Sequence, residues 1–115
     1  MLTGRKKASN LFHAMRNNLS NITEINGKKL KKSQLNLLKK LEKLGVMPAS
    51  EIADRVNPYS GARCTLPPLA VTLYDFVINS YNAGMVGRFV PLETWNNCRY
   101  FFLEFWPDEY FALID

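Results

Sequence analysis

The chain has 115 residues, of which 47% are hydrophobic and 12% aromatic, and its formal net charge is +5. This length suits one domain of ordinary size, and so many apolar and aromatic residues exclude wholesale intrinsic disorder. No apolar run approaches the ~20 residues of a membrane span, and none follows the basic N-terminus as in a secretory signal peptide. We therefore expect a protein that is not secreted and has no membrane span.

The charges are divided unevenly along the chain. Residues 1–47 carry eleven lysines and arginines against two glutamates, whereas residues 48–115 carry four arginines against eight carboxylates. Thirteen of the fourteen aromatic residues lie at or after Tyr59. This asymmetry predicts a basic half that meets a partner and a packed C-terminal half. The alternative is a solvated lysine face that only promotes solubility.

The first predicted feature is a basic, partly flexible N-terminal extension over residues 1–27, followed by a helical domain over residues 28–115. Within the extension, apolar residues from Leu11 to Leu19 have the spacing of a short helix. Asn26-Gly27 then interrupts the pattern.

The clearest predicted helix is Leu30–Leu44. When its residues are placed at 100° intervals, the leucines other than Leu35 gather on one face and most of the lysines on the opposite face, which is typical of an amphipathic helix. Gly45 is the expected left-handed cap at its C-terminal end, followed by a hydrophobic contact from Val46.

Further along the chain we predict a short helix over Ser50–Val56 and a brief extended segment over Arg63–Leu66. A helix is expected over Leu69–Tyr81, and another, apolar around most of its circumference, over Leu92–Trp106. Pro107 should start a last short helix. The predicted fold is therefore all-α: a small domain of about five helices with a basic N-terminal extension.

The residues that usually carry catalysis are few. Cys64 and Cys98 stand 34 residues apart and His13 is the one histidine, so the chain lacks the spacing of a tetrahedral metal site. We expect both cysteines to be buried thiols and His13 to be a surface or packing residue. Nucleotide-loop, nucleophile-elbow and zinc-protease motifs are missing from the sequence. The prediction is a protein that is not an enzyme and that needs no metal or cofactor.

The leading functional prediction is contact with nucleic-acid phosphates, of DNA or RNA, without readout of sequence. The predicted contact residues are basic side chains of the N-terminal half: Arg5, Lys6, Lys7, Lys28, Lys29, Lys32, Lys39, Lys40 and Lys43.

The alternative is a protein–protein interaction, self-association or virion-assembly module that uses the aromatic C-terminal helices. Its predicted interface residues are Phe105, Trp106, Tyr110 and Phe111. A third reading is attachment of the amphipathic helix to a membrane surface, although its all-leucine face lacks a Trp or Phe anchor.

Arg99 is the charged residue that stands out in the aromatic helix. It lies four residues after Trp95, so its guanidinium is expected to stack on the indole and to pair with a carboxylate such as Asp75. A buried ion pair and a ligand-binding residue are the two interpretations of this position.

Two stretches resemble known proteins. Leu35–Val56, which includes Ser50-Glu51-Ile52-Ala53, resembles the first two helices of a winged helix-turn-helix, and Leu73–Phe89 resembles its third helix and wing. The resemblance implies that the third helix would contact DNA, but Leu69–Tyr81 carries no basic residue. If the chain binds DNA, we therefore expect the lysine-rich helix Leu30–Leu44 to make the contact.

The C-terminal half is similar to short uncharacterised proteins of tailed bacteriophages. The similarity lies in Asn57-Pro58-Tyr59-Ser60-Gly61, in Leu66–Phe76, in Arg99-Tyr100-Phe101-Phe102, and in Trp106–Tyr110 with Leu113-Ile114-Asp115. It implies a viral gene product that acts in the cytoplasm of a bacterial host or in the virion.

Overall fold

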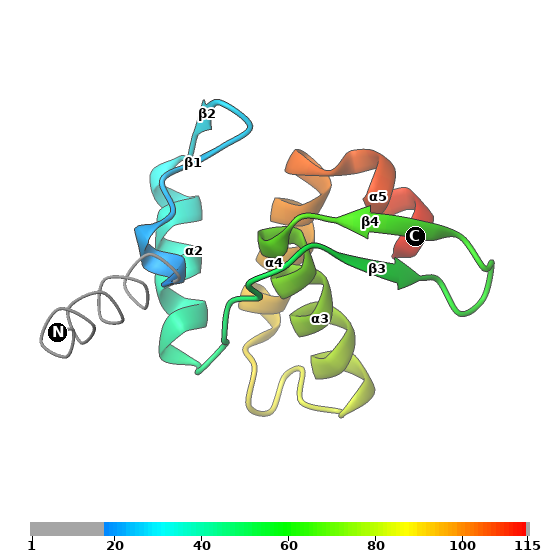
Figure 1. Ribbon diagram of the computed structural model, residues 1–115. Coiled ribbons are helices and arrows are strands. Elements are labelled where there is room, and N and C mark those ends of the chain that lie inside the picture. Colours follow the sequence, from blue (N-terminus) through cyan, green and yellow to red (C-terminus); the bar gives the residue numbers. More distant parts are fainter. Residues whose placement is uncertain (1–17, 115) are drawn as a thin grey trace, which may run out of the picture. The chain divides into compact units, whose positions relative to one another are not determined.

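The computed structural model describes residues 18–114 (Figure 1). The chain divides into two units, Met1–Pro48 and Ala49–Asp115. The division predicted between residues 27 and 28 stays a prediction. Most of the predicted Leu11–Leu19 helix lies outside the described residues.

In the first unit, a short hairpin and a 3₁₀ turn accompany one helix. The elements are η1 (Leu19–Asn21), β1 (Glu24–Ile25), β2 (Lys28–Lys29) and α2 (Lys32–Lys43). Asn26 and Gly27 form the two-residue turn of the hairpin, and both have positive φ angles, 53° and 79°. Paired positive φ angles are those of a type I′ turn, which the dipeptide Asn-Gly favours. Among residues 18–48, the hydrophobic side chains that are buried are all leucines: Leu19, Leu30, Leu37, Leu38 and Leu41.

Helix α2 has a defined start and end. At its start the Lys31 backbone N–H donates to Gln34 Oε1 over 2.8 Å. At its end Gly45 has a φ of 87°, and the Val46 N–H donates to the Leu41 carbonyl over 3.0 Å. This is the Schellman arrangement expected of a glycine cap. The predicted helix and its cap are thus confirmed, with the helix itself covering Lys32–Lys43.

The second unit combines a β-hairpin with three helices (Figure 1). Strands β3 (Ala53–Val56) and β4 (Arg63–Leu66) pair antiparallel, with Ala53 opposite Leu66 and Val56 opposite Arg63. The helices are α3 (Pro68–Asn82), α4 (Leu92–Phe105) and α5 (Pro107–Leu113). Helix α4 packs against both α3 and α5, and β4 packs against α5.

The all-α prediction is wrong, because residues 18–114 hold four helices and two small antiparallel sheets, an α/β composition. The error is greatest at Ser50–Val56, where a helix was expected and Ala53–Val56 is a strand. A helix of seven residues has little stability of its own. The extended form instead gains four pairings with Arg63–Leu66, and Ile52 remains 66% exposed.

The aromatic helix α4 supplies the centre of the second unit's core. Phe102 is fully buried, and its ring centroid lies 6.4 Å from that of Tyr74, 5.4 Å from Trp106 and 6.5 Å from Tyr110. Because these rings come from α3, α4, α5 and the residue joining α4 to α5, Phe102 links all three helices of the unit. The three helices and the extended segment expected after residue 60 are confirmed, with helix ends shifted by up to two residues.

Candidate nucleic-acid interface and an aromatic pocket

The six predicted lysines that the structure describes are all exposed, and we call them the lysine surface: Lys28, Lys29, Lys32, Lys39, Lys40 and Lys43. Helix α2 buries Leu37, Leu38 and Leu41 on its opposite side. This burial fixes the rotation of the helix about its axis, so its lysines face solvent. The predicted Arg5, Lys6 and Lys7, like His13, lie outside the described residues.

The helical part of the lysine surface is an elongated stripe. Lys32, Lys39 and Lys43 are spaced by seven and four residues, so they lie in a row along one side of α2. Lys32 and Lys43 are eleven residues apart, which corresponds to about 16 Å along the helix axis. Duplex DNA carries one charge per ~1.7 Å of axis, so a row of this length faces several phosphates.

The acidic residues of the described first unit leave this stripe uninterrupted. Residues 18–48 contain seven lysines and two glutamates, a net charge of +5. Glu42 accepts a hydrogen bond from the Ser20 backbone N–H over 3.0 Å, which lowers the pKa of its carboxyl. On the helix Glu42 therefore faces η1. Glu24 belongs to β1 rather than to the helix, and it stands opposite Lys29 in the hairpin.

The structure does not gather the four predicted interface residues into one exposed patch. Trp106 is 7% exposed and Tyr110 is 8% exposed, so both belong to the core. Phe105 is half-buried, with its ring centroid 5.0 Å from that of Phe101. Phe111 is 58% exposed and meets Tyr110 edge-on at 5.6 Å.

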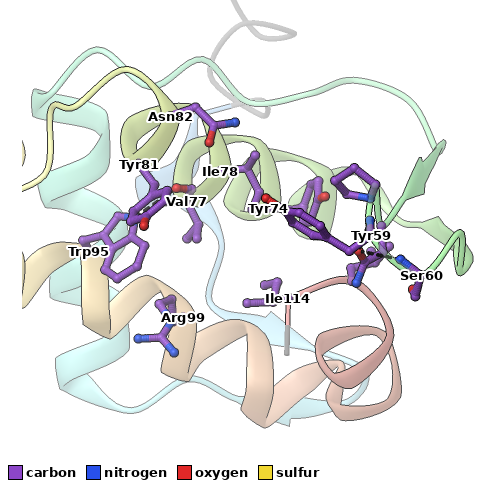
Figure 2. Close-up of a pocket in the computed structure, with 13 residues that line it drawn as sticks. Tyr59, Ser60, Tyr74, Val77, Ile78, Tyr81, Asn82, Trp95, Arg99 and Ile114 are labelled. Atoms are coloured by element: carbon purple, nitrogen blue, oxygen red, sulfur yellow. Dashed lines mark hydrogen bonds between the residues drawn. The ribbon is translucent and has the colours of Figure 1, made fainter.

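The second unit contains a pocket that was not predicted from the sequence (Figure 2). Its volume is about 680 Å³. Figure 2 shows Trp95 and Arg99 at one end, Tyr59 and Ser60 at the other, and Ile114 between them. Four aromatic side chains line it: Tyr59, Tyr74, Tyr81 and Trp95.

Asn57 holds the loop that forms one wall of this pocket. Its Oδ1 accepts hydrogen bonds from the backbone N–H groups of Tyr59 (2.8 Å) and Ser60 (3.3 Å). Its Nδ2 donates to the Ala112 carbonyl over 2.9 Å, which fastens the β3–β4 loop to α5. Asparagine at the start of a turn was the sequence signal for this local geometry. No local sequence pattern indicated the hydrogen bond from Asn57 to Ala112 in α5.

Arg99 stacks on Trp95 as predicted, with the guanidinium carbon 5.0 Å from the ring centroid. The expected ion pair with Asp75 is wrong. Asp75 is held by Arg55, whose Nε and Nη2 donate to its two carboxylate oxygens over 2.9 and 2.8 Å. Arg99 donates to neutral acceptors, Asn96 Oδ1 at 3.2 Å and the Tyr110 hydroxyl at 3.0 Å.

Both cysteines are free thiols. Cys98 is buried as predicted, and burial raises its pKa to about 12. Cys64 is half-buried, and its pKa is raised by desolvation and, to a smaller extent, by Glu109. Since the thiolate is the reactive form, neither thiol is activated as a nucleophile. In residues 18–114 no three His, Cys, Asp or Glu side chains group as metal ligands.

Comparison with known proteins assigns no role to the lysine surface or to the pocket. No protein-family model matches the chain, and neither curated proteins nor solved structures provide a match. Among the helices that the structure describes, none has both the length and the apolar character needed to cross a bilayer.

Proposed function

We propose that the first unit binds the phosphate backbone of nucleic acid through the lysine surface, without reading its sequence. The observation that carries this proposal is the opposition of two faces on α2. Leu37, Leu38 and Leu41 are buried on one side, and a row of exposed lysines with no acidic residue between them occupies the other. The leucine core keeps the row in place, so the helix does not have to reorganise on binding.

The residue types suit phosphates better than base edges. Lysine presents a compact charge on a flexible stem, whereas specific base contacts mostly use bidentate arginine or amide side chains. Residues 18–48 contain no arginine. If all six lysines contacted a duplex, the logarithm of the binding constant would fall with the logarithm of salt concentration with a slope of about −5. Micromolar binding at physiological salt is expected for such contacts.

We further propose that this binding occurs in the cytoplasm of a bacterial host or in the virion, as the expected resemblance of the C-terminal half to tailed-bacteriophage proteins implies. The alternative role, a protein–protein module centred on the C-terminal aromatics, has less support, because Trp106 and Tyr110 are buried within the chain.

The proposal is tested with a charge-matched pair of double variants. Lys39→Glu/Lys43→Glu reverses two charges of the lysine surface, and Arg63→Glu/Arg88→Glu reverses two exposed charges of the second unit. Both change the net charge by the same amount, so any difference between them reports the position of the charges rather than the total.

Binding is measured by fluorescence anisotropy with labelled duplex DNA and single-stranded RNA at 50 mM salt. We expect the lysine variant to lose at least tenfold in affinity and the arginine variant to lose less than threefold. Far-UV circular dichroism verifies that α2 is retained. Equal losses in the two variants, or no binding by the unaltered protein, would contradict the proposal.

A further inference from the structure

The pocket of the second unit has the size and lining of a small-molecule site. Its volume of about 680 Å³ lies within the ~300–1,000 Å³ range of such sites. Apolar side chains from α3 and from the C-terminal end of the described chain form much of the wall, among them Val77, Ile78, Leu113 and Ile114. Aromatic rings complete it, so a flat apolar ligand would find contact surfaces on several sides.

Arg99 is the cationic residue among those that line the pocket. Its two hydrogen bonds go to an amide oxygen and a hydroxyl, neither of which carries a charge. Within residues 18–114 no carboxylate lies within 4.0 Å of it, in contrast to Arg55, which Asp75 neutralises. A guanidinium has five N–H donors, so three remain after these two bonds.

The arginine is held rigidly in place. The Trp95 Nε1–H donates to the Val77 carbonyl over 3.0 Å, which fixes the indole against α3. The Tyr81 ring stacks on the indole with a centroid distance of 6.0 Å and an interplanar angle of 24°. The Arg99 guanidinium also lies over the indole. A preorganised cation beside an aromatic stack loses little conformational entropy when a ligand binds.

The charge of the surroundings limits which anion fits. Residues 49–115 contain four arginines and eight carboxylates and no lysine, so this half of the chain carries a net charge of −4. Such a unit repels polyanions, and one guanidinium balances one negative charge. The planar fork of arginine matches a carboxylate in bidentate geometry.

We propose that this pocket binds a small aromatic monocarboxylate, with the carboxylate paired to Arg99 and the ring held among Tyr74, Tyr81 and Trp95. Tyr59 is 97% exposed at the other end of the pocket. The C-terminus of a peptide that ends in an aromatic residue presents the same chemical groups. The test therefore compares a small aromatic monocarboxylate with such a peptide.

The test is isothermal titration calorimetry with 1-naphthylacetate and its neutral isostere, 1-naphthylacetamide. We expect submillimolar binding of the carboxylate and binding at least tenfold weaker of the amide. Arg99→Gln should reduce the carboxylate's affinity to that of the amide. Arg63→Gln, which alters an exposed arginine outside the pocket, should leave both affinities unchanged.

Equal affinities for carboxylate and amide in the unaltered protein, or no binding of either at 5 mM, would overturn the proposal without any variant having to fold. An Arg99→Gln protein with a native circular dichroism spectrum and undiminished carboxylate binding would also overturn it. The peptide acetyl-Gly-Gly-Phe with a free C-terminus tests whether the ligand is a small molecule or the end of a peptide. If this peptide binds more tightly than 1-naphthylacetate, the assignment to a small molecule is wrong.

Discussion

Replacing Trp106 by alanine is expected to destabilise the second unit by about 4 kcal/mol. The side chain is 7% exposed, and its ring lies 5.4 Å from Phe102, 6.0 Å from Phe105 and 6.4 Å from Phe101, centroid to centroid. Burying roughly 200 Å² of indole at about 25 cal/mol per Å² gives about 5 kcal/mol as an upper value. Measured truncations of core Trp and Phe residues cost about 3–5 kcal/mol.

Urea unfolding followed by tryptophan fluorescence measures this cost. Both tryptophans lie in the second unit, so the signal reports that unit, and Trp95 remains as the probe in the variant. The control is Phe111→Ala, because Phe111 is 58% exposed and its truncation should cost less than about 1 kcal/mol. A loss below 1 kcal/mol for Trp106→Ala, together with weakened self-association in sedimentation, would refute the core assignment and make the residue an interface contact.

Two further predictions concern the same unit. Asn57→Ala removes three hydrogen bonds at a buried position, to Ala112, Tyr59 and Ser60, and should cost about 3 kcal/mol in urea unfolding; a cost below 1 kcal/mol would mean that solvent replaces these bonds. Folding raises the pKa of Cys98 from 9.0 to about 12, so the thiol's contribution to stability is complete below pH 9 and is lost as the pH rises toward 12. The unfolding free energy of Cys98→Ala should therefore fall less steeply over this range than that of the unaltered protein, and parallel pH profiles would contradict this linkage.

The helices were predictable because apolar residues recur along them with helical spacing. The leucine and lysine faces of α2 and the glycine after it are local patterns, and the structure retains both. The hairpin at Asn26-Gly27 was missed although this dipeptide is a strong turn signal. Its strands have two residues each, too few to show the alternation that identifies a strand.

The errors elsewhere come from partners distant in sequence. Ser50–Val56 was predicted as a helix, although its three apolar residues fit a helix or a strand. Only pairing with Arg63–Leu66 decides that Ala53–Val56 forms a strand. Likewise, Arg99 stacks on a residue four positions away, which spacing predicts, whereas Asp75 pairs with Arg55 on another element. The pocket draws on four separate segments, so no local pattern could indicate it.

The salt dependence of duplex DNA binding tests the central claim most directly. With six lysines of one surface in contact with phosphates, the logarithm of the binding constant should fall with the logarithm of salt concentration with a slope of about −5. Lys39→Glu/Lys43→Glu should reduce the slope to about −3.5 or less in magnitude, because two phosphate contacts are lost, while Arg63→Glu/Arg88→Glu should leave it unchanged. A slope near zero for the unaltered protein, or the same slope in all three proteins, would contradict a phosphate-binding role for the lysine surface.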